Sequence, residues 1–180
     1  DGNSLPKLYG FEIAKEINDD SIEPNKTIKG APIYIAPEVY LNQGYSKASD
    51  VYSYSLILYE LITGNKPYEN MSSPKEIKEQ ITKLNQRPTF NKPIPECYQT
   101  LIEKCWSQNP KDRPTFDEIL TELRTNSDFI TDTVDKECFH KYVTFIDEFD
   151  VTFEPKRRIN QLDDILKNKL DSFLDFKSSI

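Results

Sequence analysis

Few side chains in this sequence have the types and spacing of catalytic or metal-binding residues, and this excludes several classes of site. Its single histidine, His140, excludes most histidine-based metal sites and any mechanism that needs two histidines. Hydroxyl groups in a polar loop remain as possible phosphate acceptors: Ser21, Thr27 and Tyr34. Thr27 is the best candidate phosphosite, because Lys26 and Lys29 would give a phosphate there two cationic neighbours.

The cysteines do not form a metal or redox site by their spacing. Their number is odd, and no two of them are closely spaced: Cys97, Cys105 and Cys138. We expect reduced, partly buried thiols, as in a cytoplasmic protein.

Size and charge bound the fold class and the partners. A chain of 180 residues can hold one good core, or one domain with an appendage. The formal charge of −7 argues against nucleic acid or an anionic membrane as a partner, and the densest cationic run is only Lys156-Arg157-Arg158. No apolar stretch approaches the roughly 20 residues that span a bilayer.

The middle of the chain predicts a compact helical assembly over residues 36–125. Residues 51–63 are apolar on nearly every side, which is typical of a buried central helix, and Gly64 supplies its C-terminal stop. Before this assembly, residues 1–35 are mostly irregular, with a strand-like stretch over residues 8–14.

Three further helices are predicted from their start signals. Ser73-Pro74 begins a helix over residues 73–84, with Glu76 three residues after the cap. Apolar residues at helical spacing predict another helix that begins near Pro95. A second capping box, Thr115 to Glu118, begins the last of them.

Residues 126–180 are predicted to be a helical extension. Two segments, 134–149 and 161–176, each place apolar residues on one face with charged residues between them. These faces need a partner, and we expect them to dock on the helical assembly, with dimer formation as the alternative.

The motifs of residues 7–116 resemble the C-terminal lobe of a protein kinase. Lys7-Leu8-Tyr9-Gly10-Phe11-Glu12-Ile13-Ala14-Lys15 is similar to the segment around the family's Asp-Phe-Gly, and Ala36-Pro37-Glu38 is similar to the end of its activation segment. Asp50 then opens the central helix. The ending, Cys105-Trp106 through Arg113-Pro114-Thr115-Phe116, is similar to the tyrosine-kinase-like branch.

This resemblance implies structural roles for four residues. Glu38 and Arg113 would form a buried ion pair, in which the guanidinium binds the carboxylate through two hydrogen bonds. Asp50 is a good helix N-cap by its residue type, and in the family it also accepts hydrogen bonds from the catalytic loop. Trp106, the only tryptophan, is expected to pack in the core.

The resemblance fails at the residues that carry the chemistry. Gly10-Phe11-Glu12 stands where the family has Asp-Phe-Gly, whose aspartate holds magnesium against the nucleotide phosphates. The 180 residues contain no Gly-rich phosphate loop, no nucleotide-anchoring lysine strand and no His-Arg-Asp loop, so no N-terminal lobe is expected. We therefore expect no catalytic residue, metal or cofactor in this fragment, with ATP and magnesium used by the parent protein only if it is active.

Three hypotheses of function follow. The first is a pseudokinase that acts through protein partners as a scaffold or allosteric partner. The second is an active Ser/Thr or Tyr kinase whose catalytic residues lie upstream. The third is a helical adaptor unrelated to kinases, which four motifs in the family's order argue against.

Overall fold

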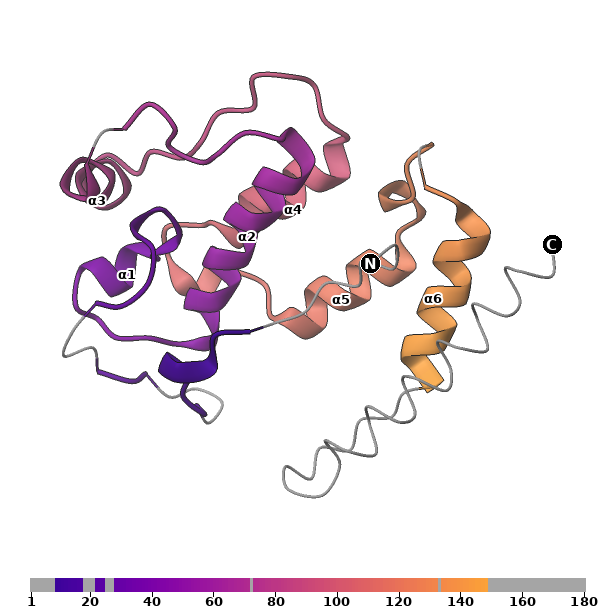
Figure 1. The fold of residues 1–180 in the computed structure, drawn as a ribbon, viewed down its shortest axis with the longest axis horizontal. Coiled ribbons are helices and arrows are strands. Elements are labelled where there is room, and N and C mark those ends of the chain that lie inside the picture. The colour runs from indigo at the N-terminus through magenta and orange to yellow at the C-terminus, as the bar shows by residue number, and fades with distance from the viewer. Residues whose placement is uncertain (1–8, 18–21, 25–27, 72, 133, 149–180) are drawn as a thin grey trace. The chain divides into compact units, whose positions relative to one another are not determined.

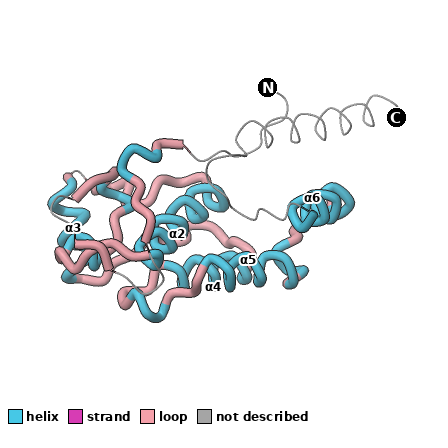
Figure 2. Tube along the Cα trace, turned by 90° about the horizontal axis from the view of Figure 1, so that it is seen from below, coloured by secondary structure: helices cyan, strands magenta, loops and turns pink. Residues whose placement is uncertain are grey.

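The mainly α fold class predicted from the sequence is confirmed. The computed structural model describes residues 9–17, 22–24, 28–71, 73–132 and 134–148 (Figure 1). Within these ranges helices are joined by loops, and β-pairing is limited to one isolated bridge between Glu23 and Tyr45 (Figure 2). The α-helices are α1 (Pro37–Tyr40), α2 (Lys47–Thr63), α3 (Pro74–Lys83), α4 (Glu96–Cys105), α5 (Phe116–Thr125) and α6 (Lys136–Glu148).

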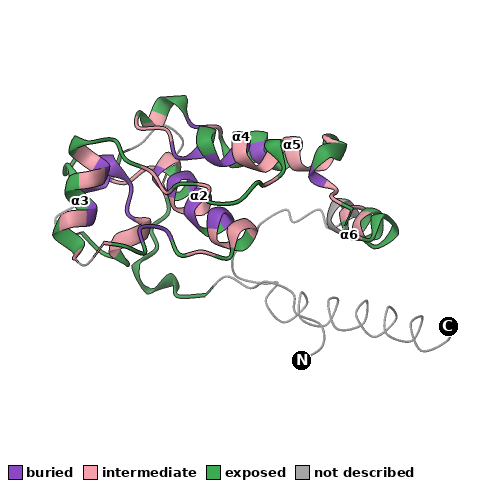
Figure 3. Ribbon diagram, turned by 90° about the horizontal axis from the view of Figure 1, so that it is seen from above, coloured by how far each residue is buried: buried purple, intermediate pink, exposed green. Residues whose placement is uncertain are grey.

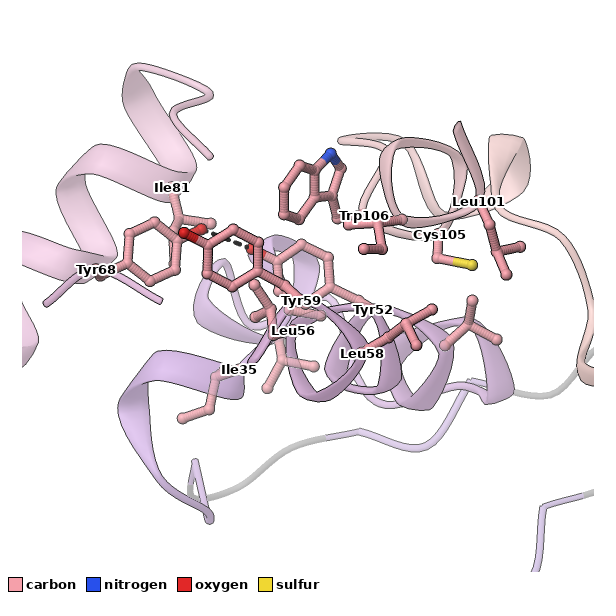
Figure 4. Close-up of a cluster of buried hydrophobic side chains, with 14 of the residues drawn as sticks. Ile35, Tyr52, Leu56, Leu58, Tyr59, Tyr68, Ile81, Leu101, Cys105 and Trp106 are labelled. Carbon is pink, nitrogen blue, oxygen red and sulfur yellow. Dashed lines mark hydrogen bonds between the residues drawn. The ribbon is translucent and has the colours of Figure 1, made fainter. Parts of the chain in front are cut away.

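Helix α2 is the central element of the core. It begins after the N-cap Ser46 and ends at Gly64, whose φ of 71° places it in the left-handed region that glycine tolerates. Buried positions gather along α2 and on the neighbouring helices (Figure 3). Helix α4 packs beside it, and the side chains between them and around α3 close the core (Figure 4): Tyr52, Leu56, Tyr59, Tyr68, Ile81, Leu101, Cys105 and Trp106.

The helix starts predicted from capping residues are confirmed. Ser73 Oγ accepts a hydrogen bond from the Glu76 amide at 3.2 Å. Thr115 and Glu118 form a reciprocal capping box, because the Glu118 carboxylate accepts from the Thr115 amide at 2.7 Å and the Thr115 hydroxyl accepts from the Glu118 amide at 3.2 Å. These local signals operate within one turn of helix, which explains why sequence alone reveals them.

Two predictions about individual elements are wrong. The stretch predicted to be strand-like over residues 8–14 contains a 3-10 helix, Phe11–Ile13, because Gly10 adopts a left-handed conformation with φ 84° and turns the chain. Helix α2 is not buried on every side: Ile57 is 48% exposed and Leu61 is 75% exposed. Apolar composition alone could not tell on how many sides the helix has neighbours.

The chain divides into two compact units, residues 1–134 and 135–180. Within the first unit, Phe129 is buried against Tyr98, and the Tyr98 hydroxyl donates to the Phe129 carbonyl at 2.9 Å; the functional division at residue 125 stays a prediction. Helix α6 belongs to the second unit and matches the helix predicted over residues 134–149. The helix predicted over residues 161–176 lies outside the described residues.

The helices that the structure describes were compared with the length and apolar character that a membrane span needs. None of them is both long enough and apolar enough to cross a bilayer.

Candidate functional site

A buried ion pair joins residues that lie 75 positions apart in the sequence. Arg113 Nη1 donates to Glu38 Oε1 at 2.7 Å, and Arg113 Nη2 donates to Glu38 Oε2 at 2.8 Å. The two residues are 7% and 6% exposed. The paired, parallel hydrogen bonds are the geometry that a guanidinium provides and a lysine cannot, so the pair fixes both distance and orientation.

The remaining donors of Arg113 are used by backbone carbonyls. Nε donates to the Ser107 carbonyl at 2.9 Å, and Nη1 also donates to the Ala48 carbonyl at 2.8 Å. The guanidinium carbon lies 5.1 Å from the centre of the Tyr52 ring, within the range of a cation–π contact. Arg113 therefore connects α1, the start of α2 and the loop after α4 at one point, which we call the Glu38–Arg113 anchor.

The start of α2 is part of this anchor. Ser49 Oγ donates to Glu38 Oε1 at 2.9 Å and accepts from the Ser46 amide at 3.1 Å, so one hydroxyl serves both the helix cap and the carboxylate. The N-cap predicted at Asp50 is wrong: the cap is Ser46, and Asp50 lies in the first turn of the helix. Ser46 has the extended backbone of an N-cap, and the helix begins at Lys47, four residues before the apolar run that starts at residue 51. The unpaired amides of the first helical turn are therefore capped at Ser46 instead of Asp50.

Asp50 faces an open hollow rather than the anchor. The residue is exposed, and its carboxylate has no hydrogen bond or ion pair within the described part of the chain. Partial desolvation by the surrounding residues raises the pKa of Asp50. The Asp50 carboxylate is thus partly desolvated, and no described residue uses its capacity to accept hydrogen bonds.

The hollow has a volume of about 780 Å³ and lies between the segment of residues 10–17, the segment before α1 and the first turns of α2. Most of the surface of the hollow is apolar. Its polar lining residues include carboxylates and lysines: Lys15, Glu23, Lys29, Ser46, Asp50 and Ser53. Lys15 and Glu23 pair with each other at 3.3 Å near the surface. Within the described residues, no group of three or more His, Cys, Asp or Glu side chains could hold a metal ion.

Gly10 lines the hollow, and Phe11 and Glu12 follow it in a 3-10 helix that ends where the Ala14 amide donates to the Phe11 carbonyl at 3.0 Å. All three are exposed, with Phe11 at 66%. Gly10 offers no side-chain ligand. The Glu12 carboxylate nevertheless lies close to it, since Glu12 Oε2 is 3.7 Å from the point where a Cβ at residue 10 would stand.

The segment that leads into α1 is hydrogen-bonded to α2 through Ser53 and Glu60, two residues that the sequence analysis did not single out. The Tyr34 hydroxyl donates to Glu60 Oε1 at 2.8 Å, and Ser53 Oγ donates to the Tyr34 carbonyl at 2.9 Å. Burial and the Glu60 carboxylate raise the pKa of Tyr34 to about 12, so its phenol stays protonated and remains a donor. The sequence signal that could have revealed this contact is Glu60, the one acidic residue in the second half of the apolar helix.

Three other residues predicted from the sequence begin a helix or pack in the core. Ala36 and Pro37 are buried and begin α1, so that Glu38 follows at its first turn. Trp106 is 6% exposed and packs against Tyr59 and Phe90, as expected of a core residue. Thr27 lies outside the described residues.

Comparison with known proteins agrees with this geometry. A family model for protein tyrosine and serine/threonine kinases matches residues 2–123. The chain belongs to the protein kinase family. Its helical first unit is therefore part of a kinase C-terminal lobe, and the Glu38–Arg113 anchor lies within the matched region.

Curated kinases of Dictyostelium discoideum resemble the chain over a similar length. It is 32% identical to the dual specificity protein kinase shkC over 124 residues, covering 68% of this chain and 24% of that kinase. It is 34% identical to the dual specificity protein kinase shkB, with 66% and 18% covered, and 37% identical to a probable LIM domain-containing serine/threonine-protein kinase, with 57% and 15% covered. The chain thus spans about a quarter or less of the length of these relatives.

Proposed function

We propose that this chain is the C-terminal-lobe part of a pseudokinase of the tyrosine-kinase-like branch, acting in signalling as a scaffold or allosteric partner. The observation that carries the proposal is Gly10 at the position of the metal-binding aspartate, in a chain that keeps the Glu38–Arg113 anchor complete. A kinase lobe that retains its structural anchor and lacks its metal ligand can present surfaces to protein partners without transferring phosphate.

ATP and magnesium, which the family uses, do not fit the described residues. Gly10 has no side-chain oxygen to offer, and among the described residues Glu12 is the carboxylate recorded beside it. Magnesium is usually held by carboxylates together with substrate phosphates, and the sequence has neither a phosphate loop nor a nucleotide-anchoring lysine strand.

The hollow beside Asp50 supports the view that a longer parent completes this lobe. In the resembling kinases the matching aspartate accepts backbone hydrogen bonds from the catalytic loop. The Asp50 carboxylate, without a hydrogen bond to any described residue, lines a hollow of about 780 Å³ that is open to such a contact. Protein partners, rather than nucleic acid or membrane, and a cytoplasmic location are consistent with the net charge of −7 and the unpaired cysteines.

A second candidate function is phosphoryl transfer by the parent to protein Ser, Thr or Tyr hydroxyls. One observation favours it: the Glu12 carboxylate lies 3.7 Å from where the Cβ of an aspartate at residue 10 would stand. A carboxylate reaching this place from Glu12 could substitute for the missing aspartate. Under this alternative the catalytic base and the nucleotide lobe lie upstream of this chain.

The proposal is tested first on the chain itself by thermal denaturation with and without ATP and magnesium. We expect the melting temperature to be unchanged, because a ligand raises it only by binding the folded state. A reproducible rise that disappears in Glu12→Gln would contradict the proposal and support the second candidate. The variant Glu16→Gln, at another exposed acid of the same segment, is the matched control.

A further inference from the structure

Tyr45, just before α2, makes three hydrogen bonds to the segment that precedes α1. Its amide donates to the Glu23 carbonyl at 2.8 Å, and its carbonyl accepts from the Glu23 amide at 2.9 Å. These two bonds form the isolated antiparallel bridge. The Tyr45 hydroxyl also accepts from the Lys29 amide at 3.0 Å. One residue is therefore bonded to the chain on both sides of residues 24–28.

Gly44 allows the two chain segments to approach this closely. It is buried and has a φ of 100°, in the region that favours glycine. A Cβ at this position would lie 2.7 Å from the Glu23 carbonyl oxygen and would overlap the side chain of Ile22. Both the backbone conformation and the approach of the two segments therefore depend on the missing Cβ.

The contacts of Tyr45 continue into the Glu38–Arg113 anchor. Ser46, the N-cap of α2, follows Tyr45 directly, and its amide donates to Ser49 Oγ at 3.1 Å. The same Ser49 hydroxyl donates to Glu38 Oε1 at 2.9 Å. A continuous series of bonds thus connects the bridge, the cap of α2 and the buried carboxylate.

We propose that Gly44 and Tyr45 form a latch that holds two arms of the segment, residues 22–24 and 28–30, on the start of α2 as one cooperative unit. Because both arms bond to the same tyrosine, opening of one arm opens the other. The latch is made of backbone groups, one phenol and a glycine, so its closure does not depend on phosphoryl transfer by the parent. A partner or a covalent change that opens one arm therefore acts on the other arm and on the cap of α2 through the same contacts.

Amide hydrogen exchange of the full 180-residue chain, followed residue by residue by NMR, tests the latch without a kinase assay. The amides of Glu23, Lys29 and Tyr45 each donate one hydrogen bond of the latch. We expect each to exchange at least tenfold more slowly than the same residue in an unstructured peptide, because exchange then requires opening of the latch. Exchange of these three amides at the rate of an unstructured peptide would overturn the proposal.

Tyr45→Phe tests whether the two arms open together. It removes the acceptor of the Lys29 amide and leaves both backbone bonds of the bridge in place. We expect the Glu23 amide, which the substitution does not touch, to exchange at least threefold faster together with that of Lys29. Faster exchange of Lys29 alone would show independent arms and contradict the latch. Tyr98→Phe is the matched control, because it removes one phenol hydrogen bond elsewhere in the same unit, and it should leave both amides unchanged.

Gly44→Ala tests the latch from the opposite arm. The added Cβ disrupts the bridge, and we expect the amides of Lys29 and Ser46 to exchange at least tenfold faster. Gly64→Ala is the matched control, because Gly64 also has a positive φ, of 71°, but a Cβ there meets no atom within 4 Å among the described residues. Equal protection of Lys29 in the two variants would contradict the proposal. If Gly44→Ala unfolds the whole unit, Tyr45→Phe still decides between cooperative and independent arms.

Discussion

The Glu38–Arg113 anchor and the Gly10–Glu12 segment both derive from kinase motifs, but their environments are opposite. At the anchor, the charged groups are buried and hydrogen-bonded to each other, to Ser49 and to backbone carbonyls. At Gly10–Glu12, the side chains are exposed, and the Glu12 carboxylate makes no hydrogen bond or ion pair with the described residues. The ion pair of the anchor is complete, whereas Gly10 stands where, under our proposal, the family has its metal-binding aspartate.

The difference indicates which constraint acts on each region. A buried charge without its partner destabilises the fold, so the anchor can be kept for stability alone. A substitution in an exposed segment changes the stability of the fold little. This contrast is the observation on which our proposal of a structural role, rather than phosphoryl transfer, rests.

The strongest test of the anchor is Arg113→Met. This change leaves the Glu38 carboxylate buried without its cation, and we expect a loss of about 3–5 kcal/mol in the free energy of unfolding. Urea denaturation followed by the fluorescence of Trp106 measures it.

Glu12→Gln is the control on the other side of the comparison, because it also removes one unit of charge, here the negative charge of an exposed carboxylate. We expect an effect within about 0.5 kcal/mol. Equal effects of Arg113→Met and Glu12→Gln would remove the distinction between the two regions.

Tyr34→Phe gives an intermediate effect. It removes the hydrogen bond to Glu60 while keeping the ring, and we expect a loss of about 1 kcal/mol. The accompanying change should be faster amide exchange in residues 28–35, measured by mass spectrometry, with the anchor intact. A larger loss than that of Arg113→Met would show that this segment, and not the anchor, carries the stability of the region.

Asp50→Asn has the smallest expected effect, and it depends on pH. Desolvation raises the pKa of Asp50 in the folded lobe, so the folded state binds the proton more tightly than the unfolded state does. The contribution of this group to stability therefore falls as the pH rises through its titration range. Asp50→Asn should be slightly more stable than the unmodified chain at neutral pH, and the difference should vanish in acid; a constant difference at all pH values would contradict the assigned cause.

Local signals predicted much of the fold. Ser73 and Thr115 with their partners three residues later marked helix starts, and Gly64 marked the end of α2, because caps act within one turn. The partners Glu38 and Arg113 could be named only through motif resemblance, since nothing local relates residues 75 positions apart.

Other features depended on tertiary context that the sequence does not reveal. Ser46 and Asp50 are both good caps by type, and the choice of Ser46 follows from Ser49 serving the Glu38 carboxylate as well. The exposure of Leu61 depends on which elements surround α2. The approach of Glu12 to Gly10 follows from the left-handed turn at Gly10, which composition does not predict.

The most direct test of the central claim is calorimetric titration of ATP into the chain extended upstream to a complete two-lobe kinase domain, with and without magnesium. Gly10→Asp, which restores the aspartate, is measured beside it. We predict that the unmodified domain shows no magnesium-dependent binding. Magnesium-dependent binding by the unmodified domain that is lost in Glu12→Gln would contradict the account, because Glu12 would then be acting as the metal ligand of a working kinase.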